Sequence, residues 1–260
     1  FSCTSLRYAG VDRIARYDVA SADVPQELDG YRIAFATDFH LASKFKERHL
    51  QGTVKALSAL QPDAILLGGD YQEGCEYVEP LFSALGSLAP PDGICAVMGN
   101  NDFERCTDEI AFSMRRNGIR LLDYAADTLH AGLVVVGVPY CTHPPLVQPL
   151  VEKQDSDDFV VFLTHSPDIV ERAALSPRHI DLALAGHTHG GQVAVLGVGL
   201  ATSSRLGWRY GHHYRTGLIC ERGAAVIVSN GVGSTWLPLR LGVPPQYHLI
   251  TLKRTESSEQ

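Results

Sequence analysis

The chain has 260 residues, of which 45% are hydrophobic, and this length is enough for one α/β domain with a large core. Its formal net charge of -7 argues against a protein that holds nucleic acid on a broad basic face. No apolar stretch approaches the roughly 18 residues of a membrane span, although an anchor or signal segment upstream of Phe1 stays open.

Short apolar runs alternate with helical patterns along the first two-thirds of the chain. Apolar residues at helical spacing predict helices from Leu50 to Leu60 and from Val78 to Leu88, and a third from about Cys106 to Asn117. Ser166, Pro167 and Asp168 predict a helix that starts directly after His165. The predicted strands are Tyr31–Thr37, Ala64–Gly68, Ile94–Met98, Leu133–Val138, Phe159–Thr164, Leu182–Ala185, Gln192–Leu196, Ala224–Ser229 and Tyr247–Leu252.

The last third of the chain is rich in predicted strands and poor in helix. This asymmetry favours two packed sheets flanked by helices over a single doubly wound sheet. We expect one domain over residues 1–260, with a core from about 30 to 252 and a frayed tail from 255 to 260. The loop from Pro139 to Pro149 and the segment from Gly197 to Gly217 have room for specificity elements.

The six cysteines are scattered and include no C-x-x-C pair. We therefore expect mostly free thiols in a reducing setting rather than a disulfide framework or a zinc site. Cys95 and Cys220 fall in predicted strands or next to them, and we expect both to be buried.

Side chains that bind metal ions follow the ends of the predicted strands. Asp38 and His40 are two residues apart, and in an extended chain such positions point the same way and can hold one cation. Asp70 follows two glycines, which let the backbone turn sharply, and its two oxygens can bridge two cations. The amide oxygen of Asn100, after the next strand, is a neutral hard ligand.

Histidines complete the pattern. His165 ends the strand Phe159–Thr164, and the sequence G-H-T-H-G-G around His187 and His189 is the most specific single signal in the chain. A histidine taken alone is more often an ordinary surface or core imidazole. The whole set, in order and at strand ends, favours a two-metal hydrolase, whose ions lie about 3.5 to 4 Å apart.

The series D-x-H, G-D, G-N-x-D, H and G-H-x-H resembles that of the calcineurin-like metallophosphoesterases, and the resemblance extends from about Gly30 to Leu252. It implies a four-layer α/β/β/α sandwich and two divalent ions, which could be manganese, iron or zinc. It also implies a shared ligand set: Asp38, His40 and His189 for the first ion, Asn100, His165 and His187 for the second, and Asp70 between them.

Two motifs and a closing segment narrow the resemblance to a bacterial branch that is anchored at the inner membrane or exported across it. They are A-G-H-T-H-G-G-Q around His187, H-S-P-D from His165, and the segment from Pro238 to Pro245. In this family the two ions activate a bridging water, and the resulting hydroxide attacks phosphorus. We expect this chemistry here.

Asn101 departs from the family pattern, which has histidine at this position in G-N-H-D, and Asp102 follows as expected. That histidine is credited with stabilising the transition state or protonating the leaving oxygen, and an amide cannot act as an acid. We therefore expect a bias toward pyrophosphate or activated diester bonds, with Asn101 donating to a phosphoryl oxygen. His143, or else His212 or His213, could supply the missing acid, although a solvated loop histidine is the ordinary alternative for each.

The Gly-rich segment offers substrate contacts as well. Guanidinium groups match phosphate geometry, and the candidates are Arg205, Arg209 and Arg215, although arginines in a polar loop are usually soluble surface. Apolar residues in the same segment either pack against the second sheet or form a rim for acyl chains or a membrane surface, namely Leu200, Leu206, Trp208 and Tyr210.

The sequence thus predicts a binuclear metal-dependent phosphoesterase for a small or lipid-linked phosphodiester or pyrophosphate, either associated with the inner membrane or exported. One alternative, implied by the resembling branch, is a pyrophosphatase for UDP-2,3-diacylglucosamine in lipid A synthesis. Another is a module that binds metal and phosphate without turnover, because of Asn101. A nuclease is disfavoured by the acidic balance of the chain.

Overall fold

The structure, a computed structural model, describes residues 14–42, 46–140, 147–170, 180–195, 198–199, 213–221, 223–235 and 240–256. Two mixed six-stranded sheets form its centre. Strands β2 to β5 of the first sheet are parallel, whereas β14 runs antiparallel to β2 and pairs with β1. The order in this sheet is β1 (Ile14–Ser21), β14 (Tyr247–Arg254), β2 (Arg32–Ala36), β3 (Ala64–Leu67), β4 (Ile94–Ala96) and β5 (Ile119–Leu121).

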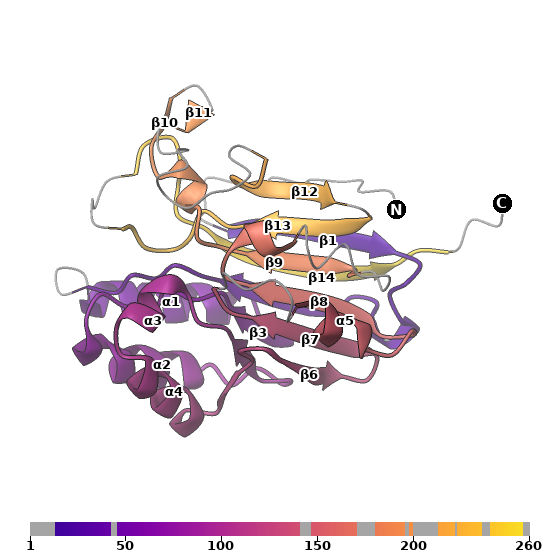
Figure 1. Cartoon of the computed structure of the whole chain (residues 1–260), viewed down its shortest axis with the longest axis horizontal. Helices are drawn as coiled ribbons and strands as arrows, with labels where there is room; N and C mark the ends of the chain where they lie inside the picture. The colour runs from indigo at the N-terminus through magenta and orange to yellow at the C-terminus, as the bar shows by residue number, and fades with distance from the viewer. Residues whose placement is uncertain are drawn as a thin grey trace.

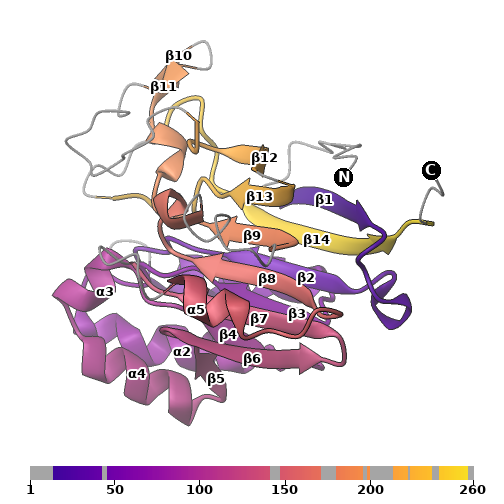
Figure 2. The same ribbon diagram turned by 45° about the vertical axis from the view of Figure 1, so that its right-hand side comes forward.

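The second sheet has a similar plan. Its four inner strands are parallel, and an antiparallel strand lies at each edge. The order is β12 (Gly217–Glu221), β13 (Ala224–Val228), β9 (Leu182–Ala185), β8 (Phe159–Thr164), β7 (Leu133–Val138) and β6 (Ala125–His130). A separate antiparallel pair, β10 (Ala194–Val195) and β11 (Val198–Gly199), projects from the body of the molecule (Figure 2).

Helices cover the outer faces of both sheets. Alternate residues of β2 point to opposite sides: Ile33 and Phe35 belong to the core between the sheets, whereas Ala34 and Ala36 belong to the core under the helices. That second core includes residues of α1 (Lys46–Ala59), α2 (Val78–Gly86) and α4 (Thr107–Arg116). Helix α5 (Val147–Glu152) lies over β7 and β8 (Figure 1). The predicted four-layer α/β/β/α architecture is confirmed.

Most predicted elements are found within a residue or two. The structure adds strands that the sequence did not predict, namely β1, β5, β6, β11 and β12. It also adds the short helix α3 (Asn100–Glu104) and the helix α5, which begins inside the predicted loop from Pro139 to Pro149. Gly118 has the left-handed backbone expected after a helix, with a φ of 71°. Short 3-10 turns are Gln26–Leu28, Cys75–Tyr77, Pro167–Ile169 and His189–Gly191.

The helix predicted after His165 differs from expectation. Only a 3-10 turn, Pro167–Ile169, is seen before residues 171–179, which lie outside the described part of the chain. The side chain of Ser166 makes no capping hydrogen bond. Among the described residues, no helix is both long and apolar enough to cross a membrane.

The expectation of mostly free thiols was wrong. Cys75 and Cys106 form a disulfide, and Cys220 is also disulfide-bonded. Cys95 is the free cysteine of the described residues and is buried in β4, as predicted, whereas Cys220 lies in β12 but is exposed. The Cys75–Cys106 pair is separated by 31 residues, so it becomes adjacent only when β3 and β4 pair side by side and bring their following loops together.

Candidate metal centre

The predicted ligands gather where the parallel strands of both sheets reach their carboxyl ends. Their backbones are unusual: φ is positive at Asp38 (54°), His40 (41°), Asp70 (54°), His187 (68°) and His189 (50°). Non-glycine residues seldom adopt this left-handed region, and such strain concentrates at functional sites. The expected extended geometry at Asp38 and His40 is therefore wrong, because left-handed turns rather than strand alternation aim both side chains at one point.

One group of ligand atoms comes from Asp38, His40 and His189, all buried and within 4.8 Å of one another. Nε2 of His40 lies 3.1 Å from Nε2 of His189, which is 3.4 Å from Oδ1 of Asp38. Two imidazole nitrogens this close need a shared proton or a cation between them. We call these residues the first group.

Asp70, His165 and His187 form a second group, again within 4.8 Å. Nε2 of His165 lies 3.1 Å from Nδ1 of His187 and 3.2 Å from the amide oxygen Oδ1 of Asn100. Asn100 therefore joins this second group through its oxygen. The mixture of imidazole nitrogens with carboxylate and amide oxygens fits manganese, iron or zinc.

Asp70 lies between the two groups. Its Oδ2 is 3.5 Å from Nε2 of His40 and 3.5 Å from Nε2 of His165. The first sheet supplies the residues that follow β2, β3 and β4, and the second supplies those that follow β8 and β9. A carboxylate with this placement can serve both groups at once.

The electrostatics of the centre reflect its burial. Burial would raise the pKa of Asp70, but His165 and His40 outweigh it and hold that pKa below its usual value. Burial similarly disfavours a charged His165, yet Asp70 raises its pKa to about 9. Burial lowers the pKa of His187 to about 3 and also lowers that of His189, so both imidazoles are held neutral.

Asn101 and Asp102 both contact the Asp70 turn. The side-chain Nδ2 of Asn101 donates to Oδ2 of Asp70 at 3.0 Å, and its backbone N–H donates to Oδ1. The buried carboxylate of Asp102 accepts from the backbone N–H groups of Asp70, Tyr71 and Gly99. Asp102 thereby fixes the turn that carries Asp70, and burial raises its pKa to about 7.

Among the predicted substrate contacts, Arg215 lies beside the segment that carries the paired histidines. It donates from Nη1 to the carbonyl of Gly190 at 2.7 Å, and its own carbonyl accepts from Thr188. His213 is exposed and packs on Tyr214. The remaining candidates, His143, Arg205, Arg209 and His212, and the apolar residues Leu200, Leu206, Trp208 and Tyr210, lie outside the described residues.

Sequence reasoning missed residues that surround these groups. Glu73 lies 2.6 Å from Nδ1 of His40, and Arg240 lies 3.1 Å from Nδ1 of His189. The ring of Tyr140, two residues after β7, is 5.4 Å from that of His187. The sequence gives only weak signals for Glu73 and Arg240. Glu73 is three positions after Asp70 and Arg240 lies inside the closing Pro238–Pro245 segment, but neither position shows what the side chain contacts.

Known proteins are similar to this chain over most of its length. A family model described as calcineurin-like phosphoesterase matches residues 31–191. An uncharacterized metallophosphoesterase of Aquifex aeolicus is 27% identical over 93% of this chain and 92% of its own length. Phosphodiesterase YaeI of Escherichia coli is 30% identical over 85% of this chain and 82% of its own. A solved crystal structure with 12% identity, covering 76% of this chain and 90% of its own, shares the fold at a TM-score of 0.53.

Proposed function

Because this chain belongs to the calcineurin-like phosphoesterase family and is a metal-dependent phosphoester hydrolase, we propose that it works with two divalent ions, one in each group of ligands. The observation that carries this proposal is the position of Oδ2 of Asp70, 3.5 Å from a histidine nitrogen of each group. When bound, a pair of ions supplies Lewis-acid activation of water and of the phosphoryl oxygens.

The side chains around the ions have separate tasks. Asp70 holds both groups together, and Asp102 keeps the Asp70 turn in place through backbone N–H groups. The amide of Asn101 lies against Asp70, where its Nδ2 can donate a hydrogen bond to a phosphoryl oxygen. An amide cannot protonate a leaving alkoxide, so we propose that the enzyme favours pyrophosphate or activated diester bonds, whose leaving groups are weak bases.

An apolar part of the substrate is supported by exposed side chains next to site residues. Phe103 follows Asp102 and is 45% exposed, and Leu241 follows Arg240 and is 55% exposed. We therefore keep a lipid-linked substrate, such as UDP-2,3-diacylglucosamine, as the second candidate beside a small diester or pyrophosphate.

The cysteines bear on where the enzyme works. Disulfides persist in oxidising compartments and are rare in reducing ones. The Cys75–Cys106 bond and the disulfide-bonded Cys220 therefore support an exported domain.

Elemental analysis and a substrate panel test the proposal. We expect about two metal equivalents per chain and hydrolysis of an aryl phosphodiester with added Mn²⁺, with loss of both after chelation. Equal rates on aryl and alkyl phosphodiesters would contradict the bias that we attribute to Asn101. Bound metal without turnover on any phosphate ester or anhydride would instead favour a module that only binds metal and phosphate.

A further inference from the structure

Glu73 contacts Nδ1 of His40, the ring nitrogen that faces away from the other ligands of the first group. We infer that Glu73 is a positioning residue for the first group of ligands, and that the Cys75–Cys106 disulfide keeps Glu73 in place. The inference rests on the proposed function, because it concerns the ability of that group to bind a cation. Its evidence is the contact of 2.6 Å between Oε1 of Glu73 and Nδ1 of His40, whose side chain is fully buried.

The contact determines which nitrogen of His40 is available. A neutral imidazole has one N–H and one lone pair, and a carboxylate can only accept. With Nδ1–H donated to Glu73, the lone pair lies on Nε2, which faces Asp70 and His189. Such carboxylate–histidine pairs orient the ring and make it a stronger ligand.

Backbone pairing brings Glu73 to this place. The segments after β2 and β3 continue side by side beyond the strand ends, since the N–H of His40 donates to the carbonyl of Asp70 and the N–H of Glu73 donates to the carbonyl of Leu41. This register pairs Leu41 with Gln72, the neighbours of His40 and Glu73, so the two side chains meet diagonally across the paired segments. The carboxylate of Glu73 still needs a second contact to stay on the ring rather than turn to solvent, because about a third of the side chain is exposed.

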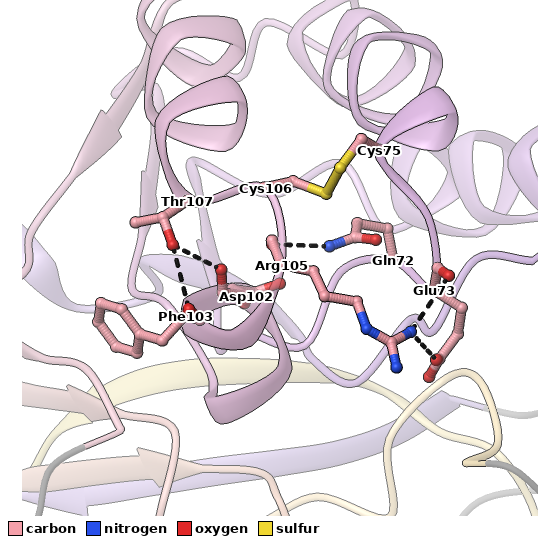
Figure 3. Close-up of a disulfide and its surroundings, with 8 residues drawn as sticks. All are labelled: Gln72, Glu73, Cys75, Asp102, Phe103, Arg105, Cys106 and Thr107. Carbon is pink, nitrogen blue, oxygen red and sulfur yellow. Dashed lines mark hydrogen bonds and ion pairs between the residues drawn. A yellow bond between two sulfur atoms is a disulfide. The ribbon is translucent and has the colours of Figure 1, made fainter.

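That second contact comes from the segment after α3. Nη1 of Arg105 lies 3.5 Å from Oε2 and from the carbonyl of Glu73, and the Gln72 side chain donates to the carbonyl of Arg105 at 3.2 Å. The disulfide joins Cys75, two residues after Glu73, to Cys106, the residue after Arg105 (Figure 3). Arg105 is 57% exposed, and exposed ion pairs stabilise little. The covalent bond is thus the stronger constraint on the loop that carries Glu73.

The first experiment is a titration of the Glu73→Gln variant with Mn²⁺, in which calorimetry measures the affinities. An Asp38→Asn variant removes a ligand of the first group, so the Mn²⁺ affinity that it weakens is the affinity of that group. We expect Glu73→Gln to weaken that same affinity by about 10- to 100-fold, the usual effect of removing such a partner, and to leave the other affinity unchanged. Glu76→Gln is the matched control, since Glu76 is an exposed carboxylate beside Cys75 in the same loop.

The second experiment tests the disulfide by removing both cysteines, as Cys75→Ala with Cys106→Ala, in the wild type and in the Glu73→Gln background. If the disulfide acts through Glu73, its loss weakens the first affinity in the wild type and adds nothing in Glu73→Gln. Equal losses in both backgrounds, or losses at both groups, would show that the bond only stabilises the fold. Urea denaturation confirms that each variant is folded.

A second substitution of Glu73, to the shorter aspartate, tests the inference even if the variant without cysteines does not fold. Glu73→Asp retains the charge but not the reach, so we expect it to weaken the first affinity as Glu73→Gln does. Wild-type affinity in both Glu73 variants would overturn the inference. A wild-type protein that binds no Mn²⁺ would instead overturn the proposed function, so the two failures are distinguishable.

Discussion

At the scale of single residues, Asp70 is the side chain that lies close to both groups of ligands. Both of its oxygens accept hydrogen bonds from Asn101, and Oδ2 lies between the histidines of the two groups. Few other side chains could take its place, because this position needs a negatively charged oxygen that reaches both groups while the residue is only 2% exposed.

Replacing Asp70 with asparagine keeps the shape of the side chain and removes its charge and one oxygen. Removing a mere partner of a ligand costs about 10- to 100-fold in activity, so we expect Asp70→Asn to lower kcat/KM by at least about 100-fold. The fold should be retained, as judged by circular dichroism. Wild-type rates in this variant would contradict the shared role of Asp70.

Arg240 has an unexpected relation to His189. A guanidinium only donates, so its Nη2, 3.1 Å from Nδ1 of His189, requires Nδ1 to accept. A cation on Nε2 of His189 requires Nδ1 to carry the proton, which places two donors face to face. Arg240 therefore has to move when a cation enters the first group, and burial already lowers its pKa to about 10.

We expect Arg240→Gln to tighten Mn²⁺ binding at the first group by about tenfold, because the amide oxygen can accept from Nδ1–H and the competing positive charge is gone. Mn²⁺ titration measures the change. A weaker affinity would show instead that Arg240 acts mainly as a brace for the carbonyls of Gly231 and Gly233, to which it also donates.

At the scale of elements, close backbone approach shapes the turns that carry the ligands. A Cβ atom at Gly186, which follows β9, would lie 2.4 Å from Oδ2 of Asp38 and 2.4 Å from Oγ1 of Thr37. Both atoms end short side chains that are fully buried and have no room to turn away, so the β9 turn and the β2 turn must separate if this glycine gains a side chain.

Gly186→Ala should therefore weaken Mn²⁺ binding at the first group at least about tenfold and lower the free energy of unfolding by about 1 to 3 kcal/mol. Gly52→Ala is the control, because a Cβ at Gly52 in α1 meets nothing within 4 Å. It should raise stability by about 0.5 to 1 kcal/mol and leave metal binding unchanged. The two quantities come from urea denaturation and metal titration.

The elements that hold the ligands could be predicted because each is an apolar run that stops at a polar residue. The edge strand β6 could not, since most of its residues are partly or fully exposed and it contains no apolar run. Strand β1 does alternate, with Ala15, Tyr17 and Val19 buried, so its period-2 pattern is a signal from which this strand can be predicted. Glu73 and Arg240 were out of reach because their contacts depend on how loops meet in space.

At the scale of the whole molecule, each group of ligands joins the two sheets. Asp38 and His40 come from the first sheet and His189 from the second, and the second group is divided in the same way. A bound ion would therefore link the sheets, and the unfolded chain cannot offer this arrangement.

Thermal unfolding should depend on metal accordingly. At a free Mn²⁺ concentration 100 times the Kd, each site adds about 2.7 kcal/mol to the free energy of unfolding. We expect Tm to rise with Mn²⁺ and to fall on chelation, as followed by calorimetry. A Tm that ignores metal would contradict this linkage between the sheets.

His248 gives the fold a dependence on acid that is independent of metal. It is fully buried between Tyr17 and Phe35, and burial lowers its pKa from the usual 6.5 to about 3. The folded chain keeps this imidazole neutral, whereas the unfolded chain takes up a proton near pH 6.5. Stability from this group is therefore complete above about pH 6.5 and is lost progressively as the pH falls toward 3.

Between pH 7 and pH 5 the wild type should lose about 2 kcal/mol more than His248→Phe, which cannot titrate. Urea denaturation at the two pH values measures this difference, and the comparison cancels the contribution of other groups. An equal loss in both proteins would mean that His248 does not control the acid response.

Cys95 lies in the core between the sheets, fully buried, and burial raises the pKa of its thiol to about 12. Only the thiolate attacks alkylating reagents, so this sulfur does not react while the two sheets are packed together. Its rate of alkylation therefore reports how often the core between the two sheets opens. The same rate shows how much bound cations slow this opening.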